Sequence, residues 1–306
     1  MSSSFPITAL DRVLRSVESV RNLRALSVLL GTFAGAGLLL AMAEASLARN
    51  AWVWGPLQIG ASLFVAFYGG NAAGLLVMDE ACGRAVRDPV QAVRDALLTA
   101  HRLVLALLCV ALAIASFGAV LCGLLWLCRV AVAGPLLGPI LFGLLLPLGV
   151  LSVGLVLLSL AAVVVPLAAP AIWSGAGVMG TLSLLVHLVR RRLLAVTLLM
   201  AVVSVLSAGV GAVATFVVVG GGRVVAELAV LVTGIDVPPQ QLMAGLFGYG
   251  LRSLGGAAAV PAGSGGHAAA ALVGGGVVFA LALVTPGLVY LRGACSVYLA
   301  MRDEAP

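Results

Sequence analysis

The sequence predicts an all-α protein, a polytopic bundle of transmembrane helices with six spans. Of its 306 residues, 62% are hydrophobic and only 9% are charged, whereas about a quarter of the residues of a soluble domain are charged. Six apolar runs are each long enough to cross a bilayer, which takes about 20 residues. We place the spans near residues 26–47, 56–78, 103–128, 140–166, 193–219 and 268–291.

The distribution of arginines predicts the orientation of these spans. With the N-terminus in the cytoplasm, thirteen of the 17 basic residues, all of them arginines, fall on the cytoplasmic side. Cytoplasmic loops of membrane proteins carry such an excess of cations. The sequence therefore predicts that both chain ends lie in the cytoplasm. The cytoplasmic arginines would be Arg12, Arg15, Arg21, Arg24, Arg84, Arg87, Arg94, Arg102, Arg190, Arg191, Arg192, Arg292 and Arg302, and the others Arg49, Arg129, Arg223 and Arg252.

A threefold pattern divides the single membrane domain, residues 1–306, into pseudo-repeats at about 7–78, 79–172 and 173–293. Each repeat holds an amphipathic segment ending in arginines, an ascending span, a descending span and a Gly or Pro helix breaker. The junctions read VRNLRAL at 20–26, AHRLVLAL at 100–107 and VRRRLLAV at 189–196. The breakers read FYGGN at 67–71, VPLAAP at 165–170 and VTPG at 284–287. Because broken helices at membrane depth need cover from protein or water, we expect these ends to pack together inside the bundle.

The cytoplasmic segments are predicted to be amphipathic helices. Asp88 and Pro89 form a helix start, with an N-cap acid before a proline at the first helical position. Val90, Val93 and Leu97 follow at helical spacing. We expect their face to rest on the bilayer interface or on the inner ends of the spans. Asp79 and Glu80, which follow the second span directly, are expected to be solvated.

The segment at about 221–266 is predicted to be an outer loop, the only sizeable region that does not span the membrane. It opens with GGGR and contains two consecutive prolines at 238–239. A short helix is expected at 240–251. The glycine-rich stretch that follows is typical of a flexible linker into the last span.

Two segments resemble a known family. Residues 70–105, GNAAGLLVMDEACGRAVRDPVQAVRDALLTAHRLVL, contain a span end, a short helix, a G-x-x-V turn and an amphipathic helix. Residues 165–198, from VPLAAPAIW to RRRLLAVT, repeat this layout. The two resemble an element of bacterial six-span membrane proteins related to the glycerophosphodiester phosphodiesterase membrane domain. The resemblance implies a fold and a role in a bacterial inner membrane. It carries over no functional residue, and LLVHLVRRR stands where that family often has a Ser-Trp/Tyr pair.

The sequence contains no motif of an enzyme or a metal site. Walker, HExxH and GxSxG patterns and carboxylate clusters are all absent. The five cysteines form no CxxC pair and are interpreted as buried thiols that behave as small hydrophobic residues. We therefore predict a non-enzymatic protein without a cofactor. The cysteines are Cys82, Cys109, Cys122, Cys128 and Cys295.

Three ionisable positions leave alternatives open. His101 and His187 both lie at the inner boundary, where they could ligate a haem between neighbouring helices or serve as ordinary interfacial histidines. Glu44 lies near the outer end of the first span. It is interpreted either as an interfacial anchor or as part of a proton relay.

The candidate binding site is a basic cluster for anionic lipid, formed by Arg190, Arg191, Arg192 and His187. Each cation near a membrane surface contributes about 1 kcal/mol to such binding. The predicted function is a membrane scaffold or accessory subunit that engages lipid, a membrane-protein partner or a second copy of itself. The alternatives are a transporter or channel for a small solute and a haem-binding redox subunit. Nucleic-acid binding is excluded, because the arginines sit at helix ends and form no long basic stripe with interleaved aromatics.

Overall fold

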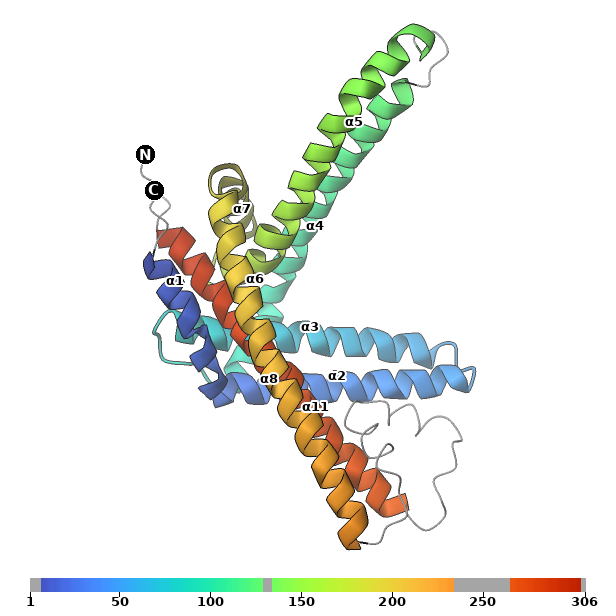
Figure 1. The fold of residues 1–306 in the computed structure, drawn as a ribbon, viewed down its shortest axis with the longest axis vertical. Coiled ribbons are helices and arrows are strands. Elements are labelled where there is room, and N and C mark those ends of the chain that lie inside the picture. Colours follow the sequence, from blue (N-terminus) through green and yellow to red (C-terminus); the bar gives the residue numbers. More distant parts are fainter. Residues whose placement is uncertain (1–6, 129–133, 234–264, 304–306) are drawn as a thin grey trace. The chain divides into compact units, whose positions relative to one another are not determined.

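A computed structural model describes residues 7–128, 134–233 and 265–303 (Figure 1). Within these ranges the regular structure is entirely helical. Six helices are long and apolar enough to cross a membrane, which confirms the predicted all-α polytopic bundle. They comprise Leu23–Ala48, Trp54–Ala81, Pro89–Leu127, Gly138–Trp173, Leu193–Val225 and Ala280–Arg302.

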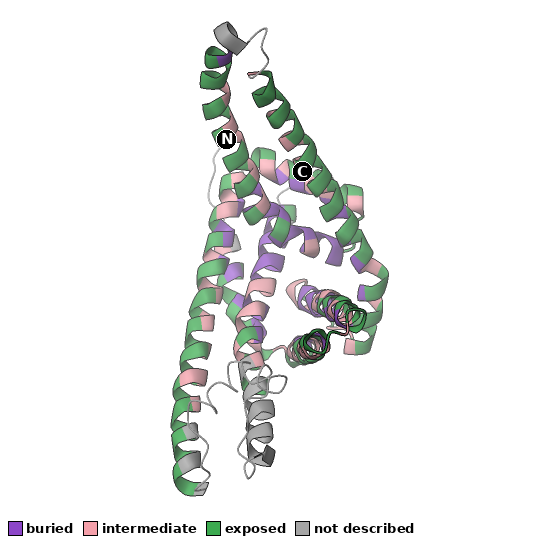
Figure 2. Cartoon of the chain, turned by 90° about the vertical axis from the view of Figure 1, so that its right-hand side faces the viewer, coloured by how far each residue is buried: buried purple, intermediate pink, exposed green. Residues whose placement is uncertain are grey.

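The described part of the chain is a series of helices. In chain order they are α1 (Ile7–Leu14), the 3-10 helix η1 (Arg15–Arg21), α2 (Leu23–Ala48), α3 (Trp54–Ala81), α4 (Pro89–Leu127), α5 (Gly134–Ser159), the π-helical turn η2 (Leu160–Val164), α6 (Val165–Trp173), α7 (Val178–Arg191), α8 (Leu193–Thr233) and α11 (Gly265–Asp303). Buried residues occupy short stretches of these helices, and exposed residues cover most of the rest (Figure 2). Exposed leucines and valines are expected on spans, since lipid tails are as apolar as they are.

The chain divides into two compact units. One contains residues 98–201 and 294–306 with the first ten residues, and the other contains residues 11–97 and 202–293. In the second unit, α2 and α3 form a hairpin (Figure 1), in which the hydroxyl of Ser62 donates to the carbonyl of Ala36 at 2.7 Å. Also in this unit, the hydroxyl of Ser207 on α8 donates to the carbonyl of Pro286 on α11 at 2.8 Å. Glycine allows close approach in both helix pairs, at Gly69 and Gly293, because an added Cβ would overlap the opposite helix.

Two of the three predicted helix breakers do not break their helices. Helix α3 runs through Gly69 and Gly70, and α11 runs through Pro286. In the second repeat, the α-helical span changes to the π-helical turn η2, which ends two residues before Pro166, and then continues as α6. Proline cannot donate a helical hydrogen bond, and a π-helical turn accommodates that loss without ending the helix. Almost every residue in the stretches after the breakers is buried, namely 71–79, 166–173 and 293–301. The breakers therefore mark where each span enters the protein interior.

The ends of α3 and α6 are followed by turns of the same type. After α3, the N–H of Cys82 donates to Met78 and that of Arg84 donates to Asp79. After α6, Ser174 and Ala176 donate in the same way to residues four and five positions before them. A glycine with positive φ follows each helix, Gly83 at 65° and Gly175 at 101°. Such left-handed positions favour glycine. The two G-x-x-V segments of the sequence thus adopt the same backbone hydrogen-bond pattern.

The three junctions between amphipathic segment and span differ. Asn22 (φ −76°, ψ 81°) separates η1 from α2, and Arg192 (φ −137°, ψ 21°) separates α7 from α8. The second junction, at 100–107, lies inside α4, which continues without interruption. Residues 221–233, predicted as the start of the outer loop, are also helical, because α8 continues to Thr233. The short helix expected at 240–251 lies outside the described residues.

The start of α4 buries a different face from the one predicted. Val90 is 76% exposed, and Val93 and Leu97 are also exposed. The buried residues are Ala92, Ala96, Ala100, Leu103 and Ala106. Contact with the rest of the chain therefore uses a row of mostly alanines, since small side chains let a helix approach its neighbours closely. The larger apolar side chains face outward, so the expectation that they rest on the inner span ends is wrong, and the alternative that they rest on the bilayer interface stays a prediction.

Candidate functional site

Helix α7 is amphipathic, and its two faces have different environments. It follows Gly177, whose carbonyl accepts the N–H of Thr181 at 2.9 Å. The side toward the protein buries Thr181, Leu185 and Leu188. These positions are three or four residues apart, which places them on one side of a helix. The opposite side of α7 is therefore free to meet membrane or solvent.

An open groove of about 830 Å³ runs along that opposite side. Its lining combines apolar residues with the cations of the last turn. Three of the four residues predicted to bind lipid, His187, Arg190 and Arg191, lie in this lining. The described residues of the lining are Met179, Leu182, Ser183, Val186, His187, Arg190 and Arg191.

Arg192, the fourth predicted residue, lies outside the groove. It ends α7, and its N–H donates to the carbonyl of Leu188 at 2.8 Å. Its φ of −137° is not helical, so its side chain leaves the regular face of α7. The conformation of Arg192 therefore separates it from the other two arginines.

The groove has the chemistry of an amphiphile site. Val186, about one turn before Arg190, is 54% exposed, and Met179, about three turns before it, is 78% exposed, so apolar side chains along this side of α7 are uncovered. Helices with exposed apolar residues beside arginines lie in the membrane interface, where cations meet phosphate and apolar groups meet acyl chains. An anionic lipid could place its headgroup at the cations of the groove and its hydrocarbon chains against the apolar residues.

Among the residues that the structure describes, the hydroxyl of Thr181, on the buried side of α7, has no hydrogen-bond partner. Such a group costs about 1–3 kcal/mol, and an apolar group of the same shape removes that cost. We expect Thr181→Val to leave the free energy of unfolding unchanged or to raise it by up to about 1 kcal/mol. Equilibrium unfolding in mixed detergent micelles would measure this. The control is Thr197→Val, because the Thr197 hydroxyl donates to Leu193 at 2.8 Å and its loss should bring no gain. A clear loss of stability in the Thr181 variant would contradict the argument.

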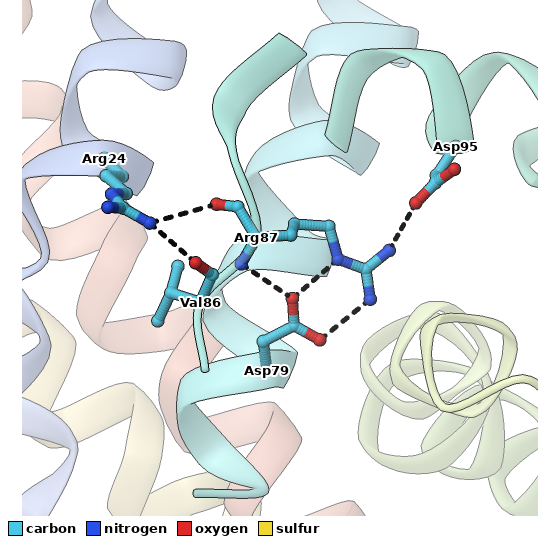
Figure 3. A network of polar contacts seen from close by, with 5 residues as sticks. All are labelled: Arg24, Asp79, Val86, Arg87 and Asp95. Atoms are coloured by element: carbon cyan, nitrogen blue, oxygen red, sulfur yellow. Dashed lines mark hydrogen bonds and ion pairs between the residues drawn. The ribbon is translucent and has the colours of Figure 1, made fainter. Parts of the chain in front are cut away.

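A second polar cluster lies at the end of α3, centred on Asp79 and Arg87 (Figure 3). Nε and Nη2 of Arg87 donate to the two carboxylate oxygens of Asp79 at 2.6 and 2.8 Å. Nη1 of the same guanidinium donates to Asp95 on α4 at 2.7 Å. These hydrogen bonds, with Asp79 as the largest cause, raise the pKa of Arg87 above its ordinary value although burial acts to lower it. The cluster ties the end of α3 to the start of α4.

Further side chains hold the same helix end. Arg24 of α2 donates to the carbonyl of Val86 at 2.6 Å, as Figure 3 shows. Arg292 of α11 donates to the carbonyl of Val77 at 3.3 Å. The Asn22 amide donates to Glu80. Cations near a helix C-terminus are stabilising, because the last carbonyls carry partial negative charge. Side chains from α2, α11 and the loop after α3 therefore converge on one helix end.

The burial of Asp79 corrects the expectation that this residue is solvated. Its side chain is 6% exposed, against 44% for Asp95. The only sign of this pair in the sequence is that Asp79 and Arg87 lie eight residues apart. That spacing does not predict a contact, because the two side chains meet only through the turn at Gly83. Sequence reasoning therefore missed the cluster.

The remaining candidate residues lie on exposed or half-buried helix surfaces. His101 on α4 and Glu44 on α2 are exposed, and His187 is half-buried. Among the described residues, no group of three or more His, Cys, Asp or Glu side chains could hold a metal ion. The cysteines are free thiols, and of the five only Cys295 is buried, whereas Cys109 and Cys122 are exposed on α4. The expectation that all five thiols are buried is therefore wrong.

Comparisons with known proteins add no assignment to this geometry. No family model, curated protein or solved structure matches the chain. The evidence for a function is therefore the groove on α7, the Asp79–Arg87 cluster and the helices that carry them.

Proposed function

We propose that this multi-pass membrane protein is a non-enzymatic scaffold or accessory subunit that engages anionic lipid through the outward side of α7. The single observation that carries the proposal is the groove, in which His187, Arg190 and Arg191 lie beside exposed apolar side chains. The arginine bias supports a location of this face at the cytoplasmic leaflet of a bacterial inner membrane, with both chain ends in the cytoplasm.

The arrangement of charges supports a phosphate-containing ligand. Arg190 and Arg191 are exposed and neighbouring, so both guanidinium groups can donate to one headgroup. Each cation near an anionic surface contributes about 1 kcal/mol. Two arginines would thus contribute about 2 kcal/mol, which corresponds to roughly thirtyfold in affinity.

The test is lipid retention by the double variant Arg190→Gln/Arg191→Gln. Full-length protein is reconstituted in nanodiscs that contain phosphatidylglycerol and phosphatidylcholine, and bound lipid is counted by native mass spectrometry after gentle extraction. We expect roughly thirtyfold weaker binding of phosphatidylglycerol and unchanged binding of phosphatidylcholine. Arg192→Gln should have a smaller effect, because Arg192 does not line the groove.

The matched control is Arg49→Gln/Arg223→Gln, which removes the same number of charges from exposed positions on α8 and at the end of α2. It should retain phosphatidylglycerol like the wild type. Equal retention by the Arg190/Arg191 variant would show that these arginines act only as topology signals. Equal losses in both double variants would show a general charge effect and no lipid site on α7.

A further inference from the structure

The start of α4 carries an apolar stripe that the described residues of the chain leave uncovered. Val90, Val93 and Leu97 are exposed, and they lie on the side of the helix opposite the buried alanines. The exposed Arg94 borders the stripe, whereas Arg102 lies on the side of α4 that carries Asp95, seven residues before it. The acidic residues of this segment lie elsewhere. Asp88 caps the helix through the N–H of Val90, and Asp95 is paired with Arg87. The stripe is therefore apolar with a cationic border.

The length of α4 places this stripe away from the bilayer. Its 39 residues extend about 58 Å at 1.5 Å per residue. A bilayer with its headgroups measures about 40–45 Å, and a typical tilt of about 20° shortens the helix along the membrane normal by only a few ångströms. Part of α4 must therefore project into water. The projecting part is its first turns, because Asp88, Arg94, Asp95 and Arg102 lie there, whereas the span beyond them is apolar.

The other two amphipathic segments lack this constraint. Asn22 and Arg192 interrupt the helix before α2 and α8, so η1 and α7 can turn to lie in the interface. The continuous backbone of α4 allows no such turn. Exposed valine and leucine side chains in water are unfavourable, since their burial removes apolar surface from water. A protein surface is the cover that remains for them.

We propose that residues 89–102 form a cytoplasmic docking face for an acidic amphipathic helix of a partner protein. The apolar side of that helix covers Val90, Val93 and Leu97, and its carboxylates meet Arg94. Charge disfavours a second copy of this chain, because two cationic borders would face each other. The inference rests on the proposed role as an accessory subunit and is independent of the lipid groove on α7.

Photo-cross-linking of the full chain in its own membranes tests the docking face. Benzoylphenylalanine replaces Val90 or Val93, and matched controls carry it at Leu112 or Val120, each 62% exposed on the same helix. We expect protein adducts at positions 90 and 93 and lipid adducts at 112 and 120. Sequencing of the cross-linked peptide should show an acidic segment with apolar residues at helical spacing.

A charge reversal shows whether the contact is the proposed one. Arg94→Glu should lower the adduct yield at position 90 at least tenfold, and Arg49→Glu, an exposed site outside the face, should leave it unchanged. Arg94→Gln provides a second, milder change if the first variant is not monodisperse. Adducts with phospholipid, adducts with a second copy of the chain, no adducts, or a yield insensitive to both changes at Arg94 would each overturn the proposal. The Arg190→Gln/Arg191→Gln variant should cross-link normally, which separates this outcome from failure of the lipid site.

Discussion

Replacing Asp79 with alanine is expected to lower the free energy of unfolding by about 3 kcal/mol, the lower end of the range for breaking a buried ion pair. The substitution leaves the Arg87 guanidinium without its bidentate partner in a partly buried place. The loss should not reach the upper end, because 26% of the Arg87 side chain is exposed and Asp95 still accepts one of its hydrogen bonds. Unfolding of the purified protein in mixed detergent micelles would measure the change.

The matched control for this variant is Asp95→Ala. Asp95 binds the same guanidinium at 2.7 Å, but its side chain is 44% exposed, so its removal should cost at most about 1 kcal/mol. The double variant Asp79→Ala/Arg87→Met removes both members of the buried pair. It should be more stable than the sum of the two single changes, because no uncompensated charge remains. Equal effects of Asp79→Ala and Asp95→Ala would mean that burial of Asp79 does not matter to the fold.

Replacing Gly69 with alanine is expected to destabilise the α2–α3 hairpin by about 1–3 kcal/mol, the usual cost of overpacking. An added Cβ would lie 2.0 Å from Oγ1 and 2.8 Å from Cβ of Thr32. Thr32 cannot move away by rotating alone, because its Cβ is attached to the backbone and its hydroxyl donates to the carbonyl of Val28 at 2.7 Å. The two helices must therefore separate. A lower apparent Tm of the purified protein would report this.

The neighbouring Gly70 supplies the control. A Cβ added at Gly70 meets nothing within 4 Å. Gly70→Ala should therefore be neutral or should stabilise by up to about 1 kcal/mol, the difference in helix propensity between glycine and alanine. Adding Thr32→Gly to the Gly69 variant should restore close packing. If both alanine variants behaved alike, the close approach of α2 and α3 at Gly69 would be wrong.

The spans could be predicted because their signal is local. Apolar runs of about 20 residues and turn residues between them predict helices wherever their neighbours lie. The same local reasoning failed at Gly69-Gly70 and Pro286. Packing covers the backbone there, and the helices continue.

The candidate lipid site was predictable in part. Helical spacing predicts that Arg190 and Arg191 lie near His187 on α7, since they follow it by three and four positions. It does not predict that Arg192 leaves the helix, because nothing in three consecutive arginines marks which one adopts a non-helical φ. The groove therefore contains three of the four predicted residues.

The sequence by itself determined the fold class and the presence of amphipathic segments before the spans. Composition and the spacing of hydrophobic residues are local signals, which can be recognised within one or two helical turns. The tertiary structure alone decided which side of each segment is buried. On α4, alanines are buried and the larger valines and leucine are exposed, since close helix approach favours small side chains over large apolar ones. It also decided that Asp79 is buried, because Arg87, Arg24 and Arg292 meet at the end of α3 only after the chain has folded. Contacts between residues far apart in the sequence have no local signal, and the physical environment of a charged group depends on them.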